Sequence, residues 1–257
     1  MIDLHYSREG MDNLFHLHLH DQVLRSDPNG YSVWEPRVRE QAVPAPRTAL
    51  LLCDVWDAHW CRGARERLEE MIPRMNAVVV HCRQKGAHII HAPSETMGFY
   101  AASPARARIL GIPSIDPPPN RPIRDRRLPI DDSDGGADTG EKPWYKAWTR
   151  QHAGIIVDDS RDVISDNGRE IYSYLHRQHI ALLLVLGVHT NMCILNRSFG
   201  IKQMVRWGVP VALVRDLTDS MYNPARAPYV SHAEGTRLVV EYIEKFWCPT
   251  VVSTELI

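Results

Sequence analysis

The residues with the clearest chemical potential lie in segment 182–195, where the apolar run LLLVLG is followed by VHTNMC. Cys193 stands six residues after Gly187, at the point where a buried strand is expected to turn into a helix. A helix N-terminus carries partial positive charge and free N–H donors, which favour a thiolate and can also bind an oxyanion. The pattern therefore predicts a nucleophilic cysteine, and the rest of the chain must supply its partners.

Asp54 is the candidate base for that thiol, because it directly follows the apolar run TALLLC (48–53). Groups at the carboxyl ends of parallel strands meet at one edge of the sheet, where α/β proteins bind ligands. The alternative is a helix-capping or loop carboxylate. A carboxylate beside a thiol opposes thiolate formation, so the pair also requires a nearby cation. Segment 141–151 offers three, which are equally compatible with a solvated loop: Lys142, Lys146 and Arg150.

The turn between Gly187 and Cys193 can also form an oxyanion site. The backbone N–H of Cys193 and that of a residue a few positions earlier could point at one spot. His189 lies within this turn and is a candidate general base. The sequence favours instead a role for its backbone, or for its ring as part of a pocket wall.

Further side chains with ligand or aromatic character cluster near Asp54. Asp57, His59 and Cys61 follow it closely, and His91 ends another predicted strand. Because D-x-H-x-C on one short loop rarely closes a tetrahedral site, we expect hydrogen-bonded loop residues, and a divalent metal near Asp57, His59 and His91 is the less favoured alternative. Several aromatic residues would either line a substrate pocket or pack a lid: Trp56, Trp60, Trp144, Tyr145 and Trp148.

Short apolar runs alternate with amphipathic segments along most of the chain, which predicts βαβ units and a parallel sheet covered on both faces. Strands are expected at 48–53, 87–91, 155–157, 181–187, 210–214 and 250–253, and helices at 64–86, 167–178, 193–208 and 230–246. Residues 1–46 are expected to form an N-terminal extended arm or hairpin, and 47–257 the main domain. A long irregular insert at about 93–150, rich in Pro, Gly and Asp, is typical of a functional loop.

Composition limits the remaining classes of protein. The 257 residues, 44% of them hydrophobic, can bury a sizeable core, and the formal net charge of -1 gives no argument for nucleic acid or membrane partners. No transmembrane run or signal peptide is expected. Five scattered cysteines without a CxxC pair fit reduced thiols in a cytoplasmic protein. Phosphate-loop, dinucleotide and GxSxG motifs do not occur.

In its candidate residues and their motifs, the chain resembles the isochorismatase-like cysteine hydrolase superfamily, which includes nicotinamidases, N-carbamoylsarcosine amidase and biuret hydrolase. The resemblance covers roughly 48–253 and rests on LLLCD, GVHTNMC and VALVRDLTDS. It implies a three-layer α/β/α fold, Rossmann-like, with a mostly parallel sheet of about six strands.

The resemblance also implies a mechanism. In an Asp–Lys–Cys triad, Asp54 would take the proton of Cys193, the thiolate would attack an amide carbonyl, and water would release the acyl group. It further implies a cis peptide bond between Val188 and His189, with the N–H groups of His189 and Cys193 as the oxyanion hole. We expect the substrate to contact Trp56, His59, Trp60 and Asn191, and we expect no cofactor and no metal.

Two departures from the family pattern stand out. The stretch VDDSRDVISDNG, where the family usually has its lysine, contains none. Lys146 is the most plausible replacement, and Lys142, Arg150 and Arg161 stay open, although a guanidinium does not release its proton. Trp56-Asp57 replaces a segment that often begins with Gln, so the substrate is not transferable. The cysteine itself argues against the isochorismatase reaction, since isochorismatases proper often have Gly there.

These observations favour a cytoplasmic cysteine hydrolase that cleaves C–N bonds in a small amide, ureide or cyclic amide, as a homo-oligomer, dimer or tetramer. The alternatives are a catalytically altered binding or regulatory protein on the same fold and an isochorismatase-type hydrolase. A phosphotransferase that uses Asp54 as nucleophile is less favoured, because that chemistry wants a second Asp where this chain has Trp56.

Overall fold

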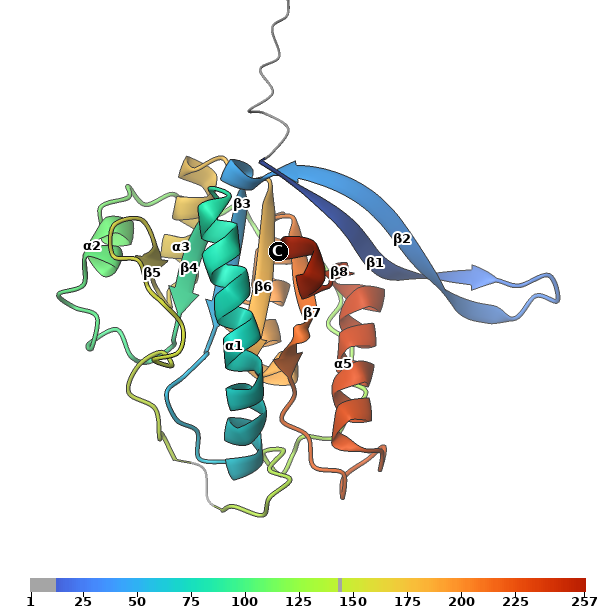
Figure 1. The fold of residues 1–257 in the computed structure, drawn as a ribbon. Coiled ribbons are helices and arrows are strands. Elements are labelled where there is room, and N and C mark those ends of the chain that lie inside the picture. The colour runs from blue at the N-terminus through green and yellow to red at the C-terminus, as the bar shows by residue number, and fades with distance from the viewer. Residues whose placement is uncertain (1–12, 143–144) are drawn as a thin grey trace, which may run out of the picture.

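One eight-stranded sheet organises the chain. The computed structural model describes residues 13–142 and 145–257. The strand order is β2-β1-β8-β7-β6-β3-β4-β5 (Figure 1). The strands are β1 (Leu14–Ser26), β2 (Ser32–Pro44), β3 (Thr48–Cys53), β4 (His88–Ala92), β5 (Val163–Ile164), β6 (Leu182–Val188), β7 (Val211–Asp219) and β8 (Thr250–Val251). The strands from β8 to β5 pair in parallel, whereas β1 pairs antiparallel with both β2 and β8.

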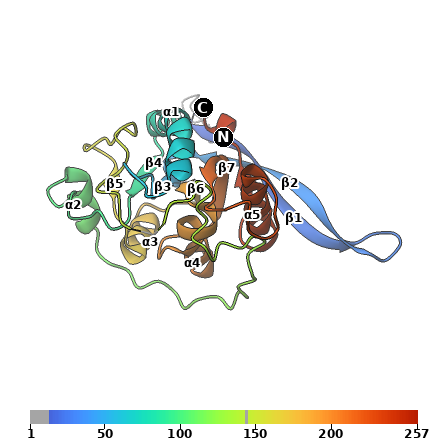
Figure 2. The same ribbon diagram turned by 90° about the horizontal axis from the view of Figure 1, so that it is seen from below.

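Helices cover both faces of this sheet, which makes three layers (Figure 2). The helices are α1 (Arg62–Gln84), α2 (Pro104–Leu110), α3 (Gly168–Arg177), α4 (Ile201–Arg206) and α5 (His232–Phe246). Side chains alternate across β3: Leu50 and Leu52 pack in the cluster that contains α1, while Leu51 packs in the cluster that contains α3, α4 and α5. This buried alternation in a parallel strand fixes which helices lie on which side.

The α/β class and the six parallel strands are therefore confirmed, and the hairpin of β1 and β2 adds two antiparallel strands. Some element predictions were wrong in detail. Residues 155–157 form no strand, and the edge strand is β5 instead. The helix expected over 193–208 is divided into a π-helical turn, Thr190–Ile194, and α4, because a turn around Ser198 and Gly200 interrupts it.

The hairpin projects from the body of the molecule (Figure 1). Phe15, Leu17 and Leu19 in the first half of β1 are buried against the α1 face of the sheet. Apart from buried Asp21, the remainder of β1 and nearly all of β2 are exposed or half-buried. At the tip, the Asp27 carboxylate accepts hydrogen bonds from the N–H groups of Asn29 and Tyr31. Among the described residues, no helix is long and apolar enough to cross a membrane.

The segment expected as an insert is mostly irregular. It contains α2 and long stretches without regular structure. Its later part, 128–142, returns to the carboxyl end of the sheet and contributes to the wall of the cavity described below.

Candidate active site

The parallel register brings the two principal candidate residues to one edge of the sheet. Cys53 at the end of β3 pairs with Gly187 near the end of β6, so Asp54 and the turn that carries Cys193 emerge side by side. Gly187 permits this approach: its φ is 114°, and a Cβ there would lie 2.1 Å from the Cys53 carbonyl oxygen. Only glycine tolerates both the backbone conformation and the contact.

Asp54 lies at the base of the site, fully buried, with a backbone φ of 50°. Its Oδ1 accepts a hydrogen bond of 2.7 Å from the Ser94 backbone N–H, and its Oδ2 accepts one of 2.8 Å from Arg197 Nε. Burial raises the pKa of Asp54, and Arg197 together with hydrogen bonds from Cys193 and Ser94 offsets part of that rise. The group is therefore a stronger base than an exposed carboxylate.

Cys193 lies in the π-helical turn that follows β6, a type of turn that often occurs at functional sites. Its thiol donates a hydrogen bond to the Asp54 carboxylate. Burial and the charge of Asp54 raise the pKa of the thiol, while Arg197 and a backbone hydrogen bond with His189 lower it in part. The resting cysteine is thus protonated and hydrogen-bonded to a base that can take its proton.

The cation beside this pair is Arg197, a residue that the sequence analysis missed. Its guanidinium hydrogen-bonds Asp54 as described and lies 3.5 Å from Glu95 Oε1. Burial disfavours its charge, yet Asp54 and Cys193 together raise the pKa of Arg197 overall. The available signal was spacing, because residues four apart share a helix face and Arg197 stands four after Cys193.

The cations singled out from the sequence occupy other positions. Lys146 donates a hydrogen bond of 2.5 Å to the Glu95 carbonyl oxygen. Arg150 Nε lies 3.8 Å from Asp57 Oδ2, and Arg161 donates to the Arg83 carbonyl oxygen. Lys142 lines the cavity described below. The place expected for Lys146, against the carboxylate, is occupied by Arg197, whereas the Lys146 ammonium binds the Glu95 carbonyl oxygen.

His189 joins β6 to the turn, and the Val188–His189 peptide bond is cis, as the resemblance implies. Its ring lies 4.8 Å from that of His59, at an interplanar angle of 67°. Burial and the neighbouring His59 lower the pKa of His189 to about 3. The ring is therefore neutral, and the backbone of His189, which contacts the thiol, is the part closest to the chemistry.

A cavity of about 890 Å³ opens above Cys193. Its aromatic wall, defined here as Trp56, His59, Trp60 and Trp148, contains near-parallel rings: Trp56 and Trp148 stack with centroids 3.9 Å apart. Burial lowers the pKa of His59 to about 4, so this ring is neutral as well. Polar residues complete the lining: Glu95, Asp132, Asp134, Glu141, Lys142, His189, Asn191, Asn196 and Arg197. Trp144 lies outside the described residues, and Tyr145 is exposed.

The predicted substrate contacts Trp56, His59, Trp60 and Asn191 all line this cavity. Asn191 also has a structural role, since its amide donates to the Met221 carbonyl and its Oδ1 accepts from the Met221 N–H. The residues considered for a metal have separate partners: Asp57 binds Thr149, His59 accepts from the Cys61 N–H, and buried His91 contacts Gln151 and Asp162. Within the described ranges, no group of three or more ligand side chains could hold a metal ion.

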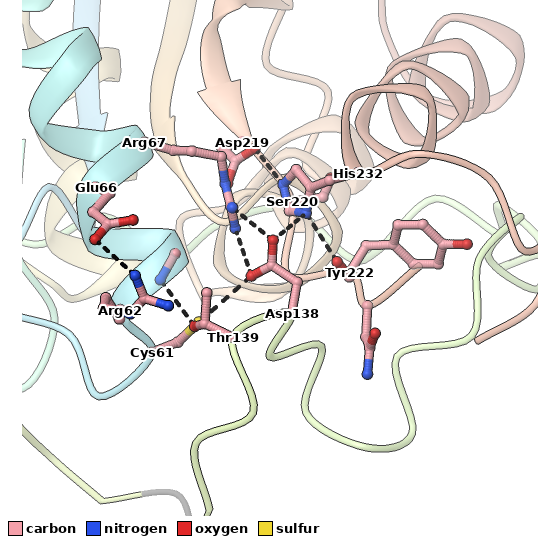
Figure 3. A network of polar contacts seen from close by, with 12 residues as sticks. Cys61, Arg62, Glu66, Arg67, Asp138, Thr139, Asp219, Ser220, Tyr222 and His232 are labelled. Atoms are coloured by element: carbon pink, nitrogen blue, oxygen red, sulfur yellow. Dashed lines mark hydrogen bonds and ion pairs between the residues drawn. The ribbon is translucent and has the colours of Figure 1, made fainter. Parts of the chain in front are cut away.

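A polar network fixes the cavity-lining segment 131–142 to the body (Figure 3). Asp138 binds the Arg67 guanidinium at 2.7 Å and lies 3.4 Å from His232 Nδ1. Arg67 and His232 also share Asp219, at the end of β7. Gly136 sits tightly on Met221, since a Cβ would lie 2.3 Å from the Met221 carbonyl oxygen. The segment is therefore held to α1, β7 and α5 together.

The chain thus combines a three-layer α/β fold with a thiol, a carboxylate and a cation at the carboxyl end of the central strands. Solved structures of a cysteine hydrolase and an isochorismatase share this fold. A cysteine hydrolase from Pseudomonas syringae pv. phaseolicola 1448A matches with a TM-score of 0.52 and 15% identity, over 83% of this chain and 92% of that one. An isochorismatase from Pseudomonas putida KT2440 matches with a TM-score of 0.51 and 12% identity, over 83% and 91%. No family model and no curated protein matches the sequence.

Proposed function

We propose that this protein is a cysteine-dependent hydrolase that cleaves the C–N bond of a small amide, ureide or cyclic amide through an acyl-enzyme on Cys193. The observation that carries the proposal is the contact of the Cys193 thiol with the buried carboxylate of Asp54, which in turn binds Arg197. Cys193 and Arg197 line a cavity large enough for a small molecule, and Asp54 is fully buried beside them. No metal or cofactor is needed for this chemistry.

Asp54 acts as the base in both halves of the reaction. As Sγ of Cys193 bonds to the amide carbon, its proton passes to Asp54, and the carbonyl oxygen becomes an oxyanion. The tetrahedral intermediate collapses by breaking the C–N bond, and Asp54 returns the proton to the leaving nitrogen. A water molecule then gives a proton to Asp54 and attacks the thioester, which releases the acid and regenerates the thiol.

Arg197 stabilises charge and does not carry protons, because a guanidinium keeps its proton throughout. Its positive charge offsets the repulsion between the Asp54 carboxylate and the developing thiolate. The backbone N–H groups of His189 and Cys193 are the proposed oxyanion donors. The neutral His189 ring is too weakly basic, with a pKa of about 3, to serve as the general base.

The decisive experiment measures acyl transfer to Cys193. The purified chain is incubated with a panel of small amides, ureides and cyclic amides, substrate loss and product formation are followed by mass spectrometry, and the enzyme is sampled by intact mass after acid quench. We expect hydrolysis of at least one class, a transient adduct on Cys193, and losses of roughly 10²-fold or more in Cys193→Ala and Asp54→Asn. Glu35→Gln, on the hairpin, is the matched control and should leave the rate unchanged.

Binding of panel compounds without any turnover or adduct, equally in the wild type and in Cys193→Ala, would contradict the proposal. That result would favour a binding or regulatory protein on the same fold.

A further inference from the structure

The cavity above Cys193 has an unbalanced charge. Two cations line it, Lys142 and Arg197, against four carboxylates: Glu95, Asp132, Asp134 and Glu141. Arg197 is already committed to two acids, since it binds Asp54 at 2.8 Å and lies 3.5 Å from Glu95. Its charge is therefore largely neutralised inside the site and is a poor attractant for an anionic substrate.

Asp132 and Asp134 carry the uncompensated part of the negative charge. Neutral amides hold both in place: Asp132 Oδ2 accepts from Asn191 Nδ2 at 2.8 Å, and Asp134 Oδ2 accepts from Asn223 Nδ2 at 2.9 Å. Across residues 13–142 and 145–257, neither carboxylate forms an ion pair with an Arg, Lys or His side chain. Both carboxylates are therefore held in place as hydrogen-bond acceptors, and no cationic side chain of the described residues pairs with either.

The aromatic wall completes a surface suited to a cation. The faces of Trp side chains attract cations, and within this site the Arg197 guanidinium already lies 5.8 Å from the centre of the Trp56 ring. The two imidazoles that line the cavity do not repel a bound cation, because burial lowers the pKa of His59 to about 4 and that of His189 to about 3. At neutral pH both rings are uncharged.

We propose that the cavity selects amide substrates that carry a positive charge, of the quaternary ammonium or protonated amine class, with the cation between the aromatic wall and the pair Asp132 and Asp134. The inference rests on the proposed function, since only a hydrolase has amide substrates. The preference for a positive charge is a property of the cavity itself. It is therefore testable at Cys193 without any hydrolysis.

The first test measures how fast charged thiol reagents reach Cys193. Trimethylammonioethyl and sulfonatoethyl methanethiosulfonate form a disulfide by the same reaction and release the same methanesulfinate, and the thioalkyl groups that they transfer differ in the sign of charge. The rate ratio of cation to anion at Cys193, located by peptide mapping, is divided by the ratio for free 2-mercaptoethanol. We expect a normalised ratio of about 10 or more.

Asp132→Asn and Asp134→Asn should each lower this ratio several-fold, whereas Glu35→Gln should not. A ratio of about one, or a preference for the anion, overturns the proposal.

The second test uses two amides of the same shape. Betaine amide and 3,3-dimethylbutanamide differ only in a quaternary nitrogen against a quaternary carbon. We expect kcat/KM for betaine amide to be higher by about 10-fold or more, with most of the difference in KM and part of it lost at high salt. Equal hydrolysis of both overturns the charge preference and leaves the hydrolase standing. A cationic reagent preference at Cys193 with no turnover of any amide overturns the hydrolase and leaves the charge preference standing.

Discussion

Arg197 shows how one residue sets the protonation of the site. Its charge lowers the pKa of both Asp54 and Cys193, against the larger rise that burial causes in each. A lysine in this position could also exchange a proton, whereas arginine supplies only its charge and the hydrogen-bond donors of a planar guanidinium. Proton transfer in this site is thereby confined to the pair formed by the thiol and the carboxylate.

Removal of the Arg197 charge should therefore shift the pH profile in a defined direction. In Arg197→Ala the pKa of Asp54 rises further, so the acid limb of kcat/KM, on which Asp54 must lose its proton, moves to higher pH. The rate at neutral pH should fall by about 10²-fold or more, the range typical for loss of one charged transition-state contact. The measurement is kcat/KM across pH with the best amide of the panel.

Arg197→Lys is the matched control, because it keeps the charge and loses the guanidinium geometry. We expect its acid limb near that of the wild type and its rate between those of the wild type and Arg197→Ala. An acid limb that moves to lower pH in Arg197→Ala would contradict the electrostatic role given to this residue.

The sequence predicted Asp54 and Cys193 correctly as neighbours but not the cation beside them. Both lie directly after continuous apolar strands, and parallel strands bring their carboxyl ends together by geometry alone. Arg197 lies in a bend after a π-helical turn, not in a regular helix, so its spacing of four residues from Cys193 was only a weak signal. Lys146 was favoured through the resemblance, which carries no information on where a long irregular segment runs.

Among the secondary-structure elements, too, those with a local sequence signal could be predicted and those without one could not. Strands β3 and β6 were predictable because each is a short and almost wholly apolar run. Edge strand β5 has two residues and no such signal. The course of segment 131–142 is set by side-chain contacts with partners far away in the chain, such as Asp138 with Arg67 and His232, which no local pattern encodes.

The network around His232 should make the anchoring of that segment depend on pH. Burial opposes the charge of His232, but its hydrogen bond with Asp219 raises the pKa above the ordinary 6.5. A folded-state pKa above the unfolded value gives stability that is fully present below about pH 6.5 and is lost as pH rises through the folded pKa. His232→Asn should therefore destabilise the protein by about 1–3 kcal/mol at low pH and by less at high pH.

Thermal unfolding of the wild type and of His232→Asn from about pH 5.5 to about pH 9 measures this difference. His176→Asn serves as the control, since His176 lies exposed on α3. A deficit in His232→Asn that grows with rising pH would reverse the sign and show that the neutral imidazole is the stabilising form.

For the whole molecule, the outstanding feature is the projecting hairpin. An isolated two-stranded hairpin is marginally stable in water, yet β1 and β2 pair over thirteen positions with much of their length away from the body. Exposed apolar side chains occur along this hairpin: Leu24 at 53% and Tyr31 at 71% on its outer part, and Val38 at 51% nearer the body, opposite His20. A second copy of the chain is the simplest cover for them, in line with the homo-oligomer expected from the resemblance.

Shortening the hairpin should thus lower the native mass without unfolding the body. Val23 and Glu35 face each other across the two strands, so residues 24–34 can be replaced by an Asn-Gly turn that preserves the inner pairs. We expect light scattering to give a dimer or tetramer for the full chain and a monomer for the shortened one. The thermal midpoint of the shortened chain, measured at low concentration, should fall modestly, because the deletion also removes Trp34, whose ring packs edge-on against Phe246 of α5. Leu24→Thr with Val38→Thr, which keeps the strands, should weaken association in the same direction. A full-length chain that stays monomeric up to high concentration would rule out self-association through the hairpin.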